Sequence, residues 1–134
     1  RDWPPAQLPA IVPGARSLEL GLPSLPGLIA ARVGIELIRA VGVPTIEARV
    51  GALAGRCIEG LLARGLPVRT ARAPADRAGV IAFEHPAAES LAIYLRRHGV
   101  DVGGYPWGLM RADPHAFNDE DDIDNLLAHI DSFA

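Results

Sequence analysis

Apolar residues recur along the chain with the spacing of helices, and this pattern outlines the first part of the fold. Between Pro26 and Gly42 they return at every fourth position, and a second stripe follows from Pro44 to Gly65. Proline suits the first turn of a helix and glycine suits the position just after its end. We therefore predict two consecutive helices, whose apolar stripes are Ile29, Val33, Leu37 and Val41, and Ile46, Val50, Leu53, Cys57 and Leu61.

After Gly65 the pattern changes to short apolar runs bounded by turn-forming residues. The first two runs are separated by the turn-rich segment APADRA, and the last two by the segment YPW. Runs of this length and spacing are typical of strands rather than helices. We predict strands at 68–72, 79–85, 100–104 and 108–112.

Two further helices complete the chain. One begins at Pro86 and stops at Gly99, and the last has Asn118 as its predicted N-cap, with Asp121 three residues later. The acidic run 119–122 suits a helix start, where the helix dipole favours negative charge. A metal site would need carboxylates that converge on a loop, so we predict no metal site here. The buried stripe of the last helix is predicted to be Ile123, Leu126, Leu127 and Ile130.

The order of elements is helix, helix, strand, strand, helix, strand, strand, helix. It predicts an α+β fold in which an antiparallel sheet of about four strands is covered by helices on one face. Residues 1–26 contain six prolines and are expected to form an extended arm or linker. The folded domain is expected to span 27–134. The glycine-rich segment GGYPWG lacks the spacing of a nucleotide-binding loop.

Composition limits the partners and the chemistry. The net charge of −3 does not favour nucleic acid or an anionic membrane as a partner. All thirteen basic residues are arginine, so the chain contains no lysine for a Schiff base. Residue 1 is arginine and the only methionine is Met110. We therefore expect the chain to be a processed product or a piece of a longer protein.

Arg111 is the most distinctive candidate for binding, because it stands at the end of a predicted strand before a marked turn. A guanidinium presents parallel N–H donors that match a carboxylate at two points. The alternative is an ordinary ion pair, with Asp113, Asp119 or Glu84 as its partner. The residues alone leave both readings open.

His115 and the aromatic turn 105–108 also have two readings each. His115 could support Arg111, or it could form a hydrogen bond that holds the turn. The segment from Tyr105 to Gly108 could line a substrate entrance, or it could be only a tight turn. The remaining histidines lack the spacing of zinc ligands: His85, His98 and His129.

Three segments resemble the class V aminotransferases, which are fold-type I enzymes that use pyridoxal phosphate. The segment 19–42, ELGLPSLPGLIAARVGIELIRAVG, resembles the family pattern Glu-x-Gly-Thr-Pro-Asn-x-Pro-Gly followed by a long helix. The segment DRAGVIAFEHP is similar to a family strand that reads Arg-x-Gly-Ile-Val-Ser-Phe. The tail LMRADPHAFNDEDDIDNLL is similar to the family's closing motif. The resemblance covers residues 19–133.

The resemblance implies a C-terminal small domain, with the cofactor and its lysine on a large domain of a longer chain. It implies an amino-acid substrate, a partner subunit in a homodimer and a cytoplasmic enzyme of amino-acid metabolism. Arg111 would bind the substrate α-carboxylate, with His115 nearby. Gly21 and Ser24 would lie near the cofactor phosphate across the dimer interface.

The sequence departs from the family pattern at three positions. Leu22 replaces a threonine whose hydroxyl reaches the cofactor phosphate in many members, although Ser24 stands two residues away. Asp113 replaces a serine, and an acid there could pair with Arg111 or cap the turn. Phe117 replaces a tyrosine and lacks its phenol.

The positions of cysteine bear on which reaction the enzyme would catalyse. Cysteine desulfurases of this superfamily carry a catalytic cysteine in the loop before the arginine strand, and the interval from Val100 to Arg111 has none. Cys57 is instead predicted to lie in the core as an unreactive thiol. We therefore expect a transaminase, epimerase or lyase rather than a desulfurase, with the chain inactive by itself. The alternative is an independent α+β module that binds a small ligand or regulates by self-association.

Overall fold

The structure is a computed structural model that describes residues 13–18 and 21–133. Contacts divide the chain into two compact units, residues 1–40 and 41–134. The arm expected over residues 1–26 falls largely outside the described residues, although Ala15–Leu18 form a short 3-10 helix, η1. Among the described residues, no helix combines the length and the apolar character needed to cross a bilayer.

Helix α1 (Leu25–Val41) forms most of the described part of the first unit. Ser24 precedes it as a cap, because its hydroxyl accepts the N–H of Gly27 at 3.3 Å and its carbonyl accepts the N–H of Leu28 at 2.9 Å. The helix predicted from Pro26 is thus confirmed. None of its residues is buried, and its exposed apolar side chains include Leu28, Ile29, Val33, Ile35 and Leu37.

Helix α2 (Val43–Ala63) begins the second unit. Pro44 lies in its first turn, and Gly65 follows its end with φ of 72°, a left-handed conformation that glycine adopts without strain. Both boundaries agree with the sequence pattern. The C-terminal half of α2 packs into the core through Leu53, Ala54, Cys57, Ile58 and Leu61.

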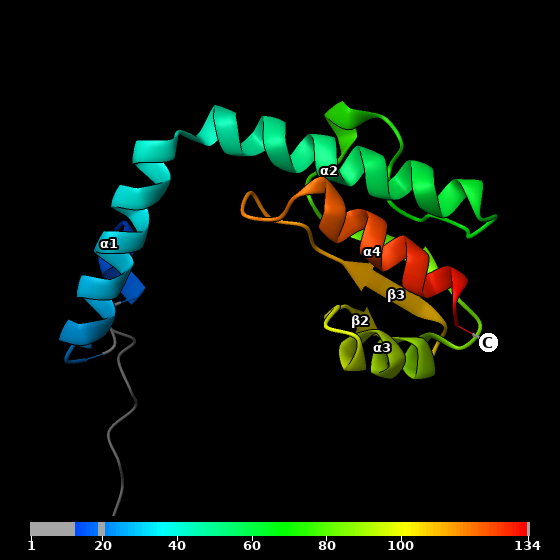
Figure 1. Cartoon of the computed structure of the whole chain (residues 1–134). Helices are drawn as coiled ribbons and strands as arrows, with labels where there is room; N and C mark the ends of the chain where they lie inside the picture. The colour runs from blue at the N-terminus through cyan, green and yellow to red at the C-terminus, as the bar shows by residue number, and fades with distance from the viewer. Residues whose placement is uncertain (1–12, 19–20, 134) are drawn as a thin grey trace, which may run out of the picture. The chain divides into compact units, whose positions relative to one another are not determined.

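The second unit contains an antiparallel sheet with strand order β1-β3-β2. Figure 1 labels β2 and β3 of this sheet. Helix α3 (Ala88–Arg97) connects the first strand to the second, and helix α4 (Glu120–Asp131) follows the third. The α+β class is confirmed, but the described residues form three strands rather than about four. The strands are β1 (Ile81–Glu84), β2 (Gly103–Gly104) and β3 (Leu109–Ala112).

The missing strand is the segment 68–72, where the prediction was wrong. Only Val68 forms a β-bridge, with Phe83 of β1. The hydroxyl of Thr70 accepts the N–H of Ala82 at 2.8 Å, so a side chain replaces the backbone partner that a continuous strand would supply. Two backbone hydrogen bonds of 2.8 Å still hold the segment along the outer edge of β1.

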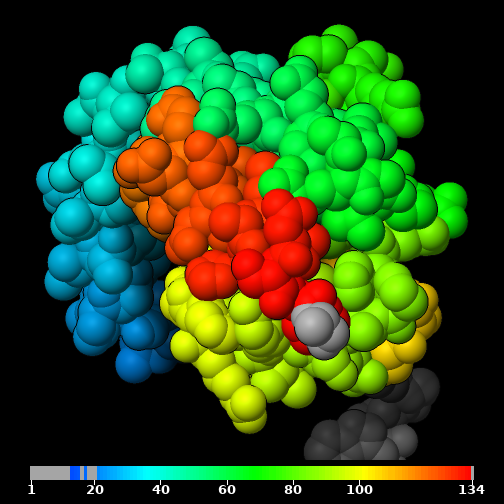
Figure 2. Space-filling view, turned by 45° about the vertical axis from the view of Figure 1, so that its right-hand side comes forward, coloured from blue at the N-terminus to red at the C-terminus, as the bar shows by residue number. Residues whose placement is uncertain are grey.

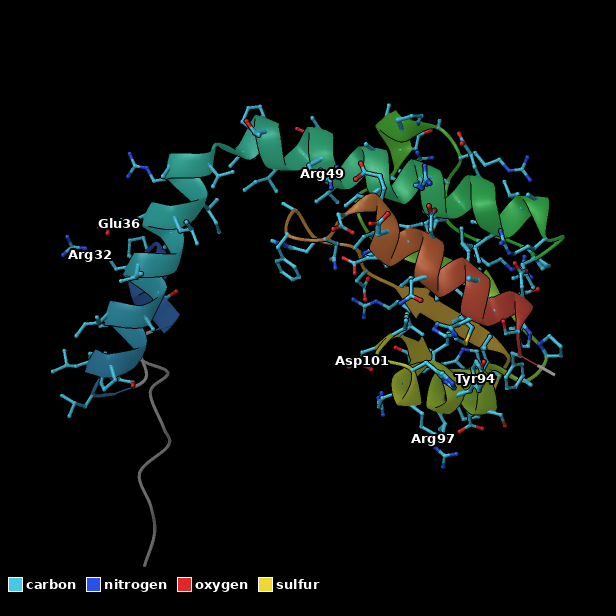
Figure 3. All side chains as sticks on the ribbon, viewed as in Figure 1. Arg32, Glu36, Arg49, Tyr94, Arg97 and Asp101 are labelled. Atoms are coloured by element: carbon cyan, nitrogen blue, oxygen red, sulfur yellow. The ribbon has the colours of Figure 1, made fainter. Side chains whose placement is uncertain are left out.

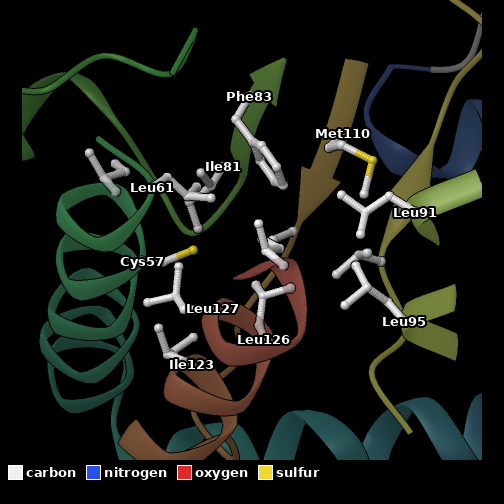
Figure 4. Packing of buried hydrophobic residues seen from close by; sticks show 14 of the residues in the cluster. Cys57, Leu61, Ile81, Phe83, Leu91, Leu95, Met110, Ile123, Leu126 and Leu127 are labelled. Atoms are coloured by element: carbon white, nitrogen blue, oxygen red, sulfur yellow. The ribbon is translucent and has the colours of Figure 1, made fainter. Parts of the chain in front are cut away.

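One face of the sheet builds the core. Ile81 pairs with Ala112 and Phe83 pairs with Met110, and all four side chains are buried. Helices α2, α3 and α4 pack against this face, so the prediction that helices cover one face is confirmed (Figure 4). Side chains alternate along a strand, so the next positions lie on the opposite face. We call this opposite face the open face; it carries Ala82, Glu84, Gly103, Leu109 and Arg111.

Helix α4 lies between α2 and α3 in the space-filling view (Figure 2). Three arginines of α2 bind three acids of α4, and Arg49 is marked at the first of these contacts in Figure 3. Each hydrogen bond from arginine lowers the pKa of its partner carboxyl. Exposed pairs contribute little stability singly, but three along one seam fix the register of the two helices. The pairs are Arg49–Glu120, Arg56–Asp124 and Arg64–Asp131.

The start of α4 differs from the prediction by one residue. Asp119, not Asn118, is the N-cap, and it forms a reciprocal capping box with Asp122. Asn118 instead uses its side chain on both sides of the boundary: Oδ1 accepts the N–H of His115 at 2.9 Å, and Nδ2 donates to Asp122 at 2.9 Å.

Candidate functional site

Arg111 is the third residue of β3 and lies on the open face. Its neighbours across the sheet are Ala82 of β1 and Gly103 of β2, both of which have little or no side chain. The Arg111 side chain is 49% exposed. A rigid strand therefore presents a guanidinium to solvent between two small neighbours, as a binding residue requires.

Two neighbouring side chains act on the Arg111 guanidinium. Its Nε donates to Asp113 at 3.0 Å, so the ion pair considered from the sequence is present. The pKa of Arg111 is raised, chiefly by this hydrogen bond and by the charge of Asp113, and to a lesser degree by the Tyr105 hydroxyl. Asp113 is itself 44% exposed, so the pair is open to solvent and its attraction is screened.

The segment Tyr105–Gly108 is a tight aromatic turn. The Tyr105 carbonyl accepts the N–H of Gly108 at 3.0 Å, and Gly108 has φ of 81°. The rings of Tyr105 and Trp107 stack with centroids 5.0 Å apart and planes 18° apart. The Tyr105 ring lies over Gly103, where an added Cβ would be 3.4 Å from it. The aromatic pair therefore rests on the open face beside Arg111.

A groove of about 500 Å³ adjoins Trp107. One wall is the loop 65–67 after α2, and the other comprises Trp107 with the end of β1 at Glu84 and His85. The Trp107 side chain is 72% exposed. The sequence pattern did not reveal this groove, because it depends on a loop that is distant along the chain.

Arg111 does not line this groove, nor two other cavities of the second unit. One of about 580 Å³ lies between the start of α2 and residues 74–79. Another, of about 150 Å³, is lined by Asp113 among others. The Arg111 guanidinium is thus exposed on the open face and lines none of these three cavities.

The other candidate residues occupy separate places. His115 is exposed and its ring packs on Phe117 with centroids 4.7 Å apart, while its backbone holds the turn through Asn118. Ser24 caps α1 as described, and Gly21 has open space around the position of a Cβ. Both belong to the first unit. A role of His115, Gly21 or Ser24 in ligand binding stays a prediction.

Cys57 lies in the core, as predicted. It is fully buried, and burial raises the pKa of its thiol to about 11. It is therefore a poor nucleophile at neutral pH. Within the described residues, no three His, Cys, Asp or Glu side chains are grouped so that they could hold a metal ion.

Comparisons with known proteins place the fold. No family model matches the chain, and no curated protein sequence matches it. Among solved structures, a cysteine desulfurase from Thermococcus onnurineus NA1 aligns over 88% of this chain with a TM-score of 0.79 and 25% identity. A NifS-like protein aligns over 92% with a TM-score of 0.74 and 18% identity. The cysteine desulfurase CsdA from Escherichia coli aligns over 85% with a TM-score of 0.73 and 19% identity.

The alignments cover only part of each neighbour. This chain spans 33%, 38% and 31% of the three neighbouring chains. A fourth structure, 8-amino-7-oxononanoate synthase from Francisella tularensis, aligns over 81% of this chain with a TM-score of 0.61 and 21% identity.

These neighbours correct one conclusion from the sequence. The exclusion of cysteine desulfurases was wrong, because proteins with that name share the fold over most of the chain. The exclusion rested on one loop, from Val100 to Arg111, that lacks cysteine. Loops vary among proteins that share a fold, so the composition of one loop does not exclude a shared fold. The motifs and the neighbours agree on that scaffold: the chain has the fold of a C-terminal domain of class V aminotransferase-like enzymes.

Proposed function

We propose that this chain is the C-terminal small domain of a longer pyridoxal-phosphate-dependent enzyme that acts on an amino acid. In this proposal Arg111 binds the α-carboxylate of the substrate. The observation that carries it is the position of Arg111, which β3 presents on the open face of a fold shared with cysteine desulfurases. The partial coverage of the neighbouring chains supports a missing large domain.

Arg111 suits the role by its chemistry and its setting. Asp113 engages the Nε side of the guanidinium, and a carboxylate would bind through the remaining N–H donors or displace Asp113. Because the Asp113 pair is exposed, displacing it costs little. Tyr105 offers a hydroxyl beside the same guanidinium. These neighbours would orient the carboxylate relative to the strand.

The cofactor would be held mainly by the rest of the enzyme. The chain has no lysine, so the residue that binds pyridoxal phosphate covalently must be supplied elsewhere. The bound cofactor would supply an electron sink for the α-carbon of the substrate. Ser24 accepts a hydrogen bond from Gly27 and keeps its own hydroxyl hydrogen for donation to a phosphate. Gly21 has open space where a side chain would begin.

The exposed apolar side of α1 suits a protein partner. Leu28, Ile29, Val33 and Leu37 are all more than half exposed. Contiguous apolar surface of this kind is usually covered in an assembly. We assign it to the large domain of the same enzyme, within a homodimer.

Replacing Arg111 with glutamine in the longer enzyme is expected to raise KM for amino-acid substrates by about 10- to 100-fold, because a charge-assisted hydrogen bond to the carboxylate is lost. Steady-state kinetics measures KM, and the absorbance of bound pyridoxal phosphate measures cofactor retention. Retention should stay close to that of the unmodified enzyme. The control is Arg97→Gln, since Arg97 projects from α3 away from the sheet (Figure 3). An unchanged KM in Arg111→Gln would remove the assignment.

Replacing Asp113 with serine is expected to strengthen the binding of a carboxylate by about two- to fivefold. Asp113 competes for the guanidinium, and exposed ion pairs of this kind have interaction energies that correspond to factors of this size. The affinity of the chain for L-alanine, measured by NMR titration, reports the change. Asp101→Ser serves as the control because Asp101 pairs with Arg96 instead. Weaker binding in Asp113→Ser would show that Asp113 helps to position the ligand.

A further inference from the structure

The aromatic turn and Arg111 lie on the same open face, so a ligand bound at Arg111 could extend toward the turn. Leu109 and Arg111 are two residues apart on one face of β3, a separation of about 7 Å along the strand. Tyr105 pairs with Leu109 through a backbone hydrogen bond of 2.9 Å. Arg111, Leu109, Tyr105 and Trp107 therefore follow one another along the open face, and the groove adjoins Trp107.

The groove beside Trp107 has the size and character of a side-chain pocket. Its volume of about 500 Å³ falls within the usual range for small-molecule sites. Tyr105 covers one face of the Trp107 ring, while the Trp107 side chain remains 72% exposed. A flat apolar group could stack on the uncovered part of that ring.

The groove contains one carboxylate, which is paired, and one histidine, which is uncharged. Glu84 accepts hydrogen bonds from Arg69, so its carboxylate is already paired. Burial lowers the pKa of His85, and its Nδ1 accepts the N–H of Ala87 at 3.2 Å, which favours the neutral ring. Neither an acidic nor a basic side chain would find an unpaired opposite charge on these walls. An uncharged ring fits better.

We propose that the amino acid bound by Arg111 carries an aromatic side chain, which stacks on Trp107 in this groove. This inference rests on the proposed function, because it takes Arg111 as the carboxylate anchor. Trp107 and Tyr105 then determine specificity.

The test compares L-phenylalanine with L-alanine by NMR titration of the chain, with backbone amide shifts as the readout. Stacking on an aromatic ring corresponds to about a two- to tenfold gain, so L-phenylalanine should bind about fivefold more tightly. Trp107→Ala is expected to reduce its affinity to that of L-alanine. Because the Trp107 side chain is largely exposed, this variant should fold. Ile93→Ala, which trims an exposed apolar residue of α3, should keep the preference.

Arg111→Gln separates the two proposals. If this variant loses both ligands while the unmodified chain binds them equally, Arg111 is the anchor and the aromatic inference is overturned. A preference for L-phenylalanine that survives in Trp107→Ala also overturns it. If Arg111→Gln binds both ligands as tightly as the unmodified chain, the carboxylate role fails, and the aromatic inference fails with it. Absence of any shift with either amino acid overturns both.

Discussion

Replacing Phe83 with alanine is expected to lower the free energy of unfolding by about 3 to 5 kcal/mol. Phe83 is fully buried in the centre of β1, paired across the sheet with Met110 (Figure 4). Removal of the ring loses its apolar burial and leaves a cavity between the sheet and the helices. Urea denaturation followed by circular dichroism measures the change.

Phe117→Ala provides the matched control, because it removes the same side chain from a position that is 83% exposed. Its effect should stay within about 0.5 kcal/mol, the usual range for surface substitutions. Comparable losses in the two variants would contradict the position of the core. A loss below about 1 kcal/mol in Phe83→Ala would do so as well, since core phenylalanines rarely cost so little.

Replacing Gly104 with alanine is expected to destabilise the protein by about 2 to 3 kcal/mol, although it adds only one methyl group. A Cβ at this position would lie 2.3 Å from the carbonyl oxygen of Ala88 and 2.7 Å from the Cβ of Ala92. Both contacts belong to α3, and the nearer one is backbone, which has no rotamer to change. The helix would have to move away from β2. Thermal and urea denaturation both report the loss.

The adjacent residue tests the same explanation. Gly103 points to the open face, where an added Cβ would make ordinary contacts of 3.4 to 3.6 Å with Tyr105 and Arg111. Gly103→Ala is expected to be neutral, or to stabilise by about 0.4 to 1 kcal/mol because the unfolded chain loses freedom. Equal destabilisation by the two substitutions would show that β2 needs glycine for its backbone rather than for contact with α3.

The helices were predictable because their signals are local. Proline and glycine mark both ends of α1 and α2 within a few residues of the observed bounds, and the apolar stripe of α4 is buried as expected. The predicted cap at Asn118 missed by one residue, since both Asn118 and Asp119 can cap a helix. The cap is the residue with extended backbone dihedral angles just before the helix, and that residue is Asp119.

The segment 68–72 shows where a local pattern fails. Val68 and its neighbours have the composition of a strand, but Thr70 provides its hydroxyl in place of a backbone partner. Whether a threonine bonds through its side chain depends on the approach of β1, which is more than ten residues away. Composition carries no information about that approach.

The candidate site was predictable only in part. The position of Arg111 at a strand end followed from the motif and the strand pattern, and the pair with Asp113 was among its expected alternatives. Its position relative to Tyr105 and Trp107 depends on the register of β2 with β3. Because β2 consists of two glycines, it has no side-chain pattern from which that register could be predicted. The groove depends on a loop that follows α2. The exclusion of cysteine desulfurases, which was inferred from one loop, was wrong because proteins can share a fold while their loops differ.

The segment that follows α2 along the outer edge of β1 has a consequence for self-association. Arg69 donates its N–H to Ala82, and Pro67 accepts the N–H of Glu84, both at 2.8 Å. The hydrogen-bonding groups through which a foreign strand would attach are therefore already occupied. Addition of strands from other molecules at this edge, the step by which amyloid-like fibrils grow, is therefore blocked by backbone of the same chain.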